Sequence, residues 1–276
     1  MMFRKYGFAG ILLILFVELN FILDLQPFAR LYFPIVWLGY ILVIDAIVYK
    51  IRKSSLISNR FSEFLGMVII SMLFWWIFEF LNLPIQNWEY PGIELLDIKM
   101  ILMGSLSFAT VLPAFFETVE LYRSIHLFDN KKLHRQHKIT KRFIHIMLTI
   151  GIVSFILPII LPRYFFPLVW GSLFFILDPI NYLHKQPSII GHLKDKKLAI
   201  PLTLLLTGIT LGFFWEFWNY WAAIKWTYDI PYVGYFKIFE MPVLGYLGYF
   251  PFAFELYAMY WFVRSLFLKK DNLLVS

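Results

Sequence analysis

The chain has 276 residues, of which 60% are hydrophobic, 21% aromatic and only 16% charged, and its formal net charge is +7. This composition lies outside the range of globular domains and is typical of an integral membrane protein. The chain contains no cysteine, which excludes disulfides, thiolate metal sites and thiol catalysis. Its basic residues lie in short loops between apolar segments, so the positive charge indicates membrane orientation and not nucleic-acid binding.

Apolar segments of nearly the ~20 residues that a helix needs to cross hydrocarbon follow one another along the chain. The first segment follows Arg4 and Lys5, as in a signal peptide, but it lacks a small-x-small cleavage site and contains Glu18. We therefore expect it to remain as a helix. The sequence predicts an all-α integral membrane protein with eight transmembrane helices, at about 6–23, 31–49, 61–82, 99–122, 143–162, 165–183, 198–221 and 241–264.

The loops between these segments alternate in charge. Most of the 25 Lys and Arg residues fall near the two termini and in every second loop. Cytoplasmic loops of membrane proteins carry an excess of Lys and Arg. We therefore predict a multi-pass protein of the cell membrane with both termini in the cytoplasm.

Three sequence patterns occur twice, in the same order, at a nearly constant offset, which indicates an internal duplication. Four crossings per copy are an even number, so both copies would enter the membrane from the same side as a parallel 4+4 repeat. We expect a first repeat at 1–125, a basic cytoplasmic linker at 126–142 and a second repeat at 143–276. The patterns are Phe-Pro-x-x-Trp at 33–37 and 166–170, Glu-x-x-Asn at 79–82 and 216–219, and Pro-x-x-Phe-Glu at 113–117 and 251–255.

Pairs of acidic residues occupy equivalent positions in the two halves. A charge in hydrocarbon costs roughly 2.5–3.5 kcal/mol on insertion scales, so an intramembrane acid usually faces the bundle interior and has a function. For Glu79 and Glu216, a functional role and hydrogen bonding across the bundle are both open. For Asp45 and Asp178 we favour a structural role, because they lie near helix ends where water can solvate a charge. The pairs are Asp45 and Asp178, Glu79 and Glu216, and Glu117 and Glu255.

The outer ends of two apolar segments could form one acidic site. Glu216 and Asn219 lie three residues apart and share a helix face, while Glu240 precedes the last segment at the same depth. Carboxyl groups that share an apolar site favour one shared proton, so one of them could act as a general acid. Our catalytic candidates are Glu216 and Glu240, with Glu79 and Asp97 as their counterparts in the first half.

Aromatic residues near these acids have two interpretations. Aromatic belts at the membrane interface account for most of them. A few recur at each helical turn beside Glu216 and could line a pocket, where ring faces stabilise a carbocation or hold a polyene. No pair of intramembrane histidines could bind a haem and we expect neither metal nor cofactor. The candidates for ligand binding are Trp215, Trp218, Asn219, Trp226, Tyr228, Trp76, Asn82 and Trp88.

The second half contains a series of short motifs, Trp215-Glu216, Lys225-Trp226, Tyr228, Tyr232-x-Gly234 and Ile238-Phe239-x-Met241-Pro242. This series resembles the repeated domain of the integral-membrane lycopene cyclases, over about the last three helices of each half and more weakly in the first. The resemblance implies a three-helix repeat present twice and joined by an extra helix. It also implies a polyene between the copies, and acids that protonate a terminal double bond without redox change.

One motif departs from that family. Glu216 stands where the family has an Asp, but Val243 and Leu244 follow Pro242 where the family has a Glu-Glu pair. Glu240 is the only nearby acid that could replace this pair. The resemblance therefore implies the architecture and a long apolar ligand.

Two hypotheses follow from these patterns. The first is a lycopene-cyclase-like enzyme, a cyclase or isomerase, that acts on a carotenoid or other isoprenoid lipid by proton transfer without a cofactor. The second is a lipid-binding or transport protein, or a non-catalytic membrane subunit, in which the symmetric acids bind or gate an ion.

Overall fold

The computed structural model describes residues 3–92, 98–136 and 138–267. Most of this part of the chain is helical, and each of its strands is only two residues long. In chain order the elements are α1 Lys5–Leu23, α2 Tyr32–Arg52, α3 Leu56–Asn59, α4 Phe61–Ile85, β1 Trp88–Glu89, α5 Ile98–Phe108, α6 Val111–Ser124, α7 Lys141–Ile160, α8 Pro162–Phe165, η1 Phe166–Leu168, α9 Val169–Leu183, α10 Ile189–Lys194, α11 Ala199–Trp221, β2 Thr227–Tyr228, β3 Lys237–Ile238, β4 Met241–Pro242, η2 Val243–Gly248 and α12 Tyr249–Phe267.

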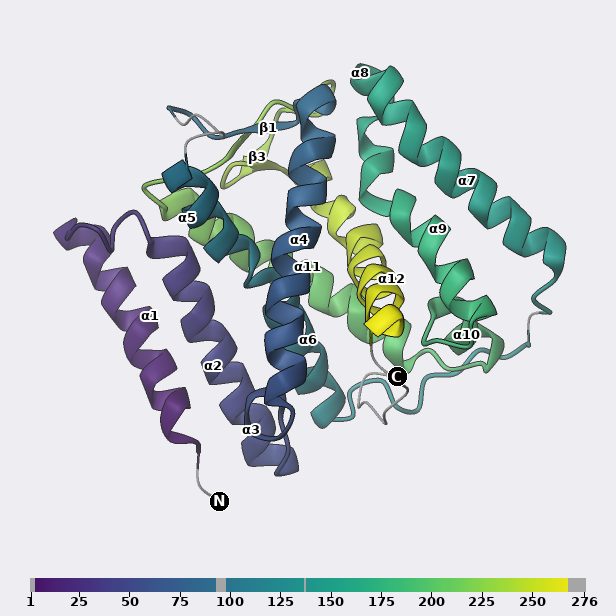
Figure 1. Cartoon of the computed structure of the whole chain (residues 1–276), viewed down its shortest axis with the longest axis horizontal. Coiled ribbons are helices and arrows are strands. Elements are labelled where there is room, and N and C mark those ends of the chain that lie inside the picture. Colours follow the sequence, from purple (N-terminus) through teal and green to yellow (C-terminus); the bar gives the residue numbers. More distant parts are fainter. Residues whose placement is uncertain (1–2, 93–97, 137, 268–276) are drawn as a thin grey trace.

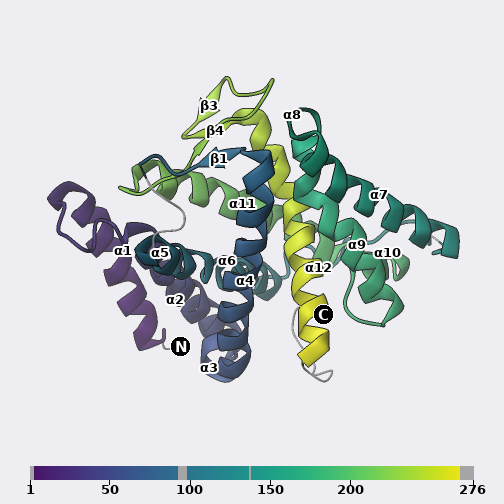
Figure 2. The same ribbon diagram turned by 45° about the horizontal axis from the view of Figure 1, so that its top comes forward.

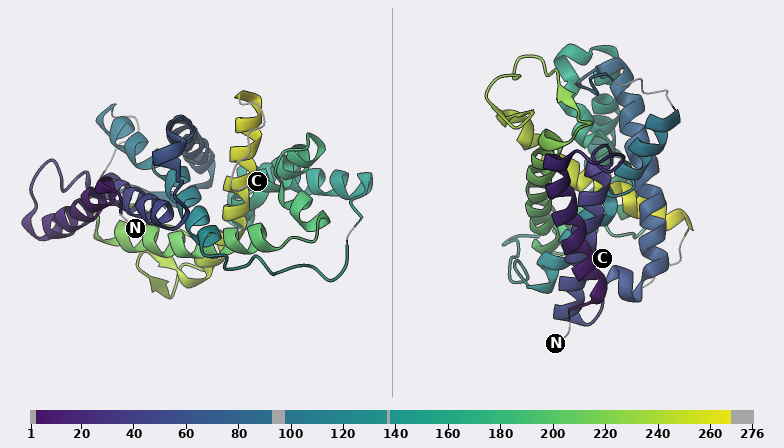
Figure 3. Two further views of the ribbon diagram at one scale, coloured as in Figure 1. Left: turned by 90° about the horizontal axis from the view of Figure 1, so that it is seen from below. Right: turned by 90° about the vertical axis from the view of Figure 1, so that its left-hand side faces the viewer.

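The long helices form two flanks around a central group. Helices α1 and α2 pack together on one flank, α7 and α9 on the other, and α4 and α12 stand between them (Figure 1). Helix α11 extends beneath this central group and contacts α2, α6 and α12 (Figure 3). The short helices α3 and α10 lie at one end of the molecule, while β1, β3 and α8 lie at the opposite end (Figures 1 and 2).

Seven helical segments of the described chain are long and apolar enough to cross a membrane, which supports a multi-pass membrane protein. They coincide with the first seven segments expected from the sequence. Residues of the expected eighth segment, 241–264, form β4, η2 and most of α12. The seven are Lys5–Leu23, Tyr32–Arg52, Phe61–Ile85, Ile101–Ser124, Lys141–Ile160, Pro162–Leu183 and Ala199–Trp221.

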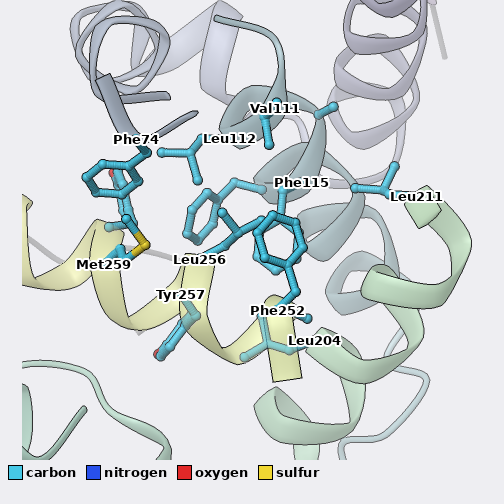
Figure 4. Packing of buried hydrophobic residues seen from close by; sticks show 14 of the residues in the cluster. Phe74, Val111, Leu112, Phe115, Leu204, Leu211, Phe252, Leu256, Tyr257 and Met259 are labelled. Carbon is cyan, nitrogen blue, oxygen red and sulfur yellow. The ribbon is translucent and has the colours of Figure 1, made fainter. Parts of the chain in front are cut away.

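Helices α6 and α12 form the centre of the core. Leu112 and Phe115 of α6 face Leu256 of α12, and Leu204 and Leu211 of α11 close the cluster on the side of that helix (Figure 4). All five side chains are at most 1% exposed. Because α6 lies before the linker expected at 126–142 and α12 after it, the core joins both halves of the chain.

The linker expected at 126–142 is attached to the second half. Lys132 and Lys197 form an isolated antiparallel bridge. The backbone N–H of Leu133 donates to Lys196, and that of Leu198 donates to Lys131. These bonds hold the linker against the loop that follows α10.

Two buried aspartates cap the short helices. Asp178 accepts hydrogen bonds from the backbone N–H groups of Ile189, at 2.7 Å, and Ile190, at 2.9 Å, at the start of α10. Asp45 accepts from the backbone of Ile57 at 2.8 Å, at the start of α3. The first N–H groups of a helix have no partner within the helix, so a carboxylate there satisfies them. Both carboxylates therefore stabilise the start of a helix.

Glycines allow α1 and α2 to touch through their backbones. A Cβ on Gly39 would lie 2.8 Å from the carbonyl oxygen of Gly10 and 2.7 Å from Ile14. We expect Gly39→Ala to lower the free energy of unfolding by about 1–3 kcal/mol, since overpacking costs that much. Gly66→Ala is the matched control, because nothing lies within 4 Å of its added Cβ. Thermal unfolding in detergent should show the control at or above the parent. Equal melting of both variants would contradict this close approach.

His192 of α10 gives the fold a dependence on pH. Burial, reinforced by the charges of Lys197 and Arg123 and opposed by Asp195, lowers the pKa of His192 to about 4. An unfolded histidine titrates near 6.5, so the unfolded state binds the extra proton first. This contribution to stability is complete above pH 6.5, and we expect it to be lost as the pH falls from 6.5 towards 4.

The measurement is the free energy of unfolding in detergent between pH 8 and 4. His192→Gln should flatten the decline below pH 6.5, because glutamine does not titrate. The ring nitrogen Nε2 of His192 lies 3.0 Å from the Tyr257 hydroxyl, and glutamine retains a polar end there. An unchanged decline in this variant would mean that other groups set the acid sensitivity.

Candidate functional site

A cavity of about 350 Å³ lies where the two halves of the chain meet. This volume is within the usual range of small-molecule sites. Its walls are mainly aromatic and aliphatic, with few polar groups. The lining residues are Arg30, Phe33, Pro34, Trp75, Trp76, Asn87, Trp88, Tyr90, Met103, Gly104, Ser107, Phe108, Val111, Phe166, Pro167, Trp170, Trp215, Ile224, Trp226, Tyr228, Ile230, Val233, Met241, Leu244, Gly245, Gly248, Tyr249 and Phe252.

Rings from one half pack on rings from the other along these walls. Phe33 lies edge-on to Trp226, with 5.2 Å between ring centroids, and Trp88 lies 5.6 Å from Trp170. Aromatic pairs prefer such tilted or edge-on arrangements. The Phe-Pro-x-x-Trp pattern of each half therefore contacts the Trp-x-Tyr pattern of the other half.

Interrupted helices surround the cavity. Between α5 and α6 the helix breaks, and Ser71 of α4 repairs the break: its hydroxyl donates to the carbonyl of Phe108 at 2.6 Å and accepts from the N–H of Leu112 at 2.9 Å. Unpaired backbone groups at membrane depth are tolerated where they are buried in protein or line a cavity. The residues beside this break, Phe108 and Val111, are part of the cavity wall.

Glu79 is held from one side by three donors. Its Oε1 accepts from the indole of Trp75 at 3.0 Å, the indole of Trp88 at 3.3 Å and the hydroxyl of Tyr90 at 2.7 Å. The side chain is 4% exposed, and its Oε2 has no hydrogen-bond partner in the described chain. All three donors line the cavity, whereas Glu79 does not. The carboxyl group thus lies behind the wall.

Glu216 is held in the same way. Its Oε1 accepts from the hydroxyls of Tyr228 at 2.7 Å and Tyr249 at 2.6 Å, while the indole of Trp226 donates to Tyr228 at 2.6 Å. Its Oε2 is buried and likewise without a described partner. Burial, and next the Glu216 charge, raise the pKa of Tyr228 well above its ordinary value, so this hydroxyl stays protonated.

One hydrogen-bond donor comes from a different helix at each of the two carboxyl sites. Trp75 precedes Glu79 by four residues, and the residue four before Glu216 is Gly212. A Cβ on Gly212 would overlap the ring of Tyr249. Tyr249 therefore fills the space that a side chain at 212 would occupy, and it supplies the bond that Trp75 supplies to Glu79.

The two asparagines of the Glu-x-x-Asn patterns hold the loops that return to these sites. Asn219 donates to the carbonyl of Trp226 and accepts from its N–H, both at 2.9 Å. Asn82 donates to the carbonyl of Trp88 at 2.7 Å and accepts from the N–H of Asn87 at 2.9 Å. Both amides therefore position the aromatic residues of the wall and are themselves outside it.

Strands β1 and β2 join the two loops. They pair antiparallel, with Trp88 opposite Tyr228 and Glu89 opposite Thr227. The pair lies beside the cavity, because Trp88 and Tyr228 belong to its wall.

The remaining residues expected at the site are placed as follows. Trp215 and Trp76 line the cavity, but Trp218 does not, and its indole donates to Glu18 at 3.1 Å. Glu240 is also outside the lining and forms an ion pair of 2.6 Å with Lys225. Asp97 lies outside the described residues.

The inner acids lie apart from the cavity. Glu255 accepts from the backbone N–H of Leu173 at 2.8 Å, and both oxygens of Glu117 are buried without a described partner. Arg60 forms an ion pair with Glu120. None of these residues lines the cavity.

Sequence reasoning did not select Arg30, Tyr90 or Tyr249 for the site. The repeated Trp-x-Tyr pattern carries the signal for Tyr90, which is the counterpart of Tyr228. No comparable signal marks Tyr249, because the equivalent position in the first half is Val111. For Arg30 the sequence offers no signal other than its charge.

A scan against protein-family models, a search of curated proteins and a search of solved structures each found no match.

Proposed function

We propose that the protein binds a long isoprenoid lipid in this cavity and moves a proton to or from one of its double bonds, as an isomerase or cyclase without a cofactor. One observation carries the proposal: Tyr90 and Tyr228 form part of an aromatic wall, and each donates to a buried carboxyl group directly behind it. This arrangement offers a proton source beside an apolar chain.

The tyrosine hydroxyls would act as relays. When Glu216 is protonated, its hydrogen bond with Tyr228 reverses: Glu216 passes a proton to Tyr228 as Tyr228 passes its own to an alkene carbon, so that no tyrosinate forms. The resulting cation lies among Trp215, Trp226 and Phe252, whose ring faces attract positive charge. Loss of a proton from a neighbouring carbon returns the carboxyl group to its first state. The net change is a shift of a double bond or a ring closure, without oxidation.

The proposal includes the duplicated architecture that is expected from the sequence. Eight membrane segments would form two copies of a four-helix unit, related by an axis along the membrane normal. Support comes from matched contacts: Glu79 and Glu216 each accept from the tyrosine of a Trp-x-Tyr pattern, and Asp45 and Asp178 cap equivalent helices. The β1–β2 register agrees, since Glu89 and Thr227 occupy equivalent positions and face each other.

The proposed orientation has both termini in the cytoplasm. The basic loops that contain α3 and α10 lie at one end of the molecule, and the cavity lies nearer the other end, with β1 and β2. The resemblance to the integral-membrane lycopene cyclases adds the expectation of a polyene between the two copies. A ligand at the seam fits this expectation.

Lipid extraction tests the proposal. The chain is expressed in hosts that accumulate lycopene or shorter isoprenoids, and the lipids are separated by chromatography before and after purification of the protein. We expect an isoprenoid to copurify with the parent and a new isomer to appear in the membranes. Trp226→Ala should lose the copurified lipid. An unchanged lipid profile together with empty purified protein would refute the proposal.

A second candidate function is lipid or proton-coupled transport. The end of the seam opposite the cavity is closed by polar contacts between α4 and α12: Tyr260 donates to Glu63 at 2.8 Å, and Arg264 lies 3.6 Å from Glu63. A carrier needs such a breakable contact on one side of its site. Glu63→Gln should impair uptake in vesicles if the protein is a carrier, and should leave lipid conversion intact if it is an enzyme.

A further inference from the structure

Arg30 places a positive charge at the mouth of the cavity. Arg30 is the only residue with a formal charge among the described residues that line the cavity, and its side chain is exposed. A residue that is both exposed and part of the lining lies where the cavity meets its surroundings. The walls beyond it are aromatic and aliphatic.

No carboxylate of the described chain neutralises Arg30. The acids closest to it in sequence are occupied elsewhere: Asp24 accepts from Gln26 at 3.0 Å, and Glu18 accepts from Tyr32 and Trp218, both at 3.1 Å. Arg30 itself takes part in none of the ion pairs of the described residues. By contrast, Lys225 is paired with Glu240 at 2.6 Å.

A second polar group of the wall also lacks a partner. Asn87 lines the cavity with its side chain 3% exposed, and its Oδ1 is buried without a hydrogen bond within the described chain. A buried polar atom without a partner costs about 1–3 kcal/mol, so such atoms are normally satisfied by a ligand or water. The free Oδ1 of Asn87 is an acceptor and needs a donor, such as water or the hydroxyl of a singly protonated phosphate, whereas Arg30 needs an acceptor. A pure hydrocarbon offers neither.

From these observations we infer that the natural ligand is a single-chain amphiphile, with an anionic head, a carboxylate or a phosphate, at Arg30 and an apolar chain in the aromatic cavity. The inference rests on the proposed function and narrows its substrate class from isoprenoid lipids in general to isoprenoid acids or phosphates. A guanidinium donates two parallel hydrogen bonds to either head group. The low dielectric of the neighbouring cavity strengthens that attraction.

The test uses the purified full-length protein in a nonionic detergent. The first probe is cis-parinaric acid, a tetraene that accepts energy from excited tryptophan, with its uncharged methyl ester as the partner probe. The second pair is geranylgeranyl phosphate and geranylgeraniol, measured by displacement of the first probe. The carboxylate and phosphate arms show which head group is preferred.

We expect the parent to bind the acid or the phosphate at least about fivefold more tightly than the matching neutral probe, and this preference should shrink with added salt. Arg30→Gln should bring the ratio close to one, while Arg30→Lys keeps part of it. The matched control is Arg163→Gln, because Arg163 lies over the ring of Tyr232, 5.9 Å from its centroid, and is not part of the lining.

The outcomes separate the inference from the proposed function. If the parent binds neither member of either pair, the apolar cavity does not take such chains, and both statements fail. If the parent binds charged and neutral probes equally, or if Arg30→Gln keeps the preference, the anionic head is refuted while the proposed function stands. Loss of the preference in Arg163→Gln would likewise overturn the assignment to Arg30.

Discussion

Under the proposed function, replacing Glu216 with glutamine should reduce the conversion of the isoprenoid substrate by about 100-fold or more. General acid–base catalysis contributes typically 10²–10⁴-fold, and glutamine cannot exchange the proton. Glutamine still accepts from Tyr228 and Tyr249, so the wall should keep its shape. The measurement is the rate at which the product isomer appears in membranes of a producing host, divided by the amount of protein.

Two tyrosine variants sharpen this prediction. Tyr228→Phe removes the relay and should lower the rate as much as Glu216→Gln, with no further loss in the double variant, because residues that act as one unit are not additive. Tyr246→Phe is the control, since the hydrogen bond that its hydroxyl forms within the described chain goes to the backbone of Ile238, at 3.2 Å. Parent-like conversion by Glu216→Gln would remove the carboxyl group from the mechanism.

Asp178→Ala should lower the free energy of unfolding by about 2–5 kcal/mol. It leaves the N–H groups of Ile189 and Ile190 without their acceptor, and each unsatisfied buried donor costs about 1–3 kcal/mol. Asp178 lies apart from the cavity lining, so the affinity for parinaric acid should not change in protein that is still folded. Unfolding in detergent and fluorescence titration measure the two quantities on one sample.

The control for this variant lies at the other end of the same helix. Asp195 follows α10, and its carboxylate approaches Lys197 only at 3.9 Å with both side chains exposed. Asp195→Ala should therefore stay within about 0.5 kcal/mol of the parent. A stable Asp178→Ala protein with lost ligand binding would reverse the roles that we assign to Asp178 and Glu216.

Hydrophobic length predicted most of the fold, because each long apolar run had to satisfy its backbone internally and could only be a helix. The breaks inside these runs were not predictable. Ser71 lies 37 residues from Phe108 along the chain and repairs the α5–α6 break through tertiary contact. The residues at 241–248 are apolar enough to read as helix, yet they form β4 and η2 before α12 begins.

The site was partly predictable for a similar reason. The Trp-x-Tyr pattern marked Trp88, Trp226 and Tyr228 because it occurs in both halves of the sequence. Sequence spacing cannot show on which side of a helix a ring packs, so Trp218 was expected in the pocket although it contacts Glu18. Tyr249 depends on the exchange with Gly212, which only a three-dimensional view reveals.

The β1–β2 ribbon ties the two carboxyl sites mechanically. Trp88 and Tyr228 face each other across it; Trp88 donates to Glu79, and Tyr228 donates to Glu216. A chain that pushes one tyrosine outward must pull on the other loop through the same backbone hydrogen bonds. The protein would then bind one ligand at a time, because a ligand beside Glu79 or Glu216 would prevent a second ligand from binding beside the other glutamate.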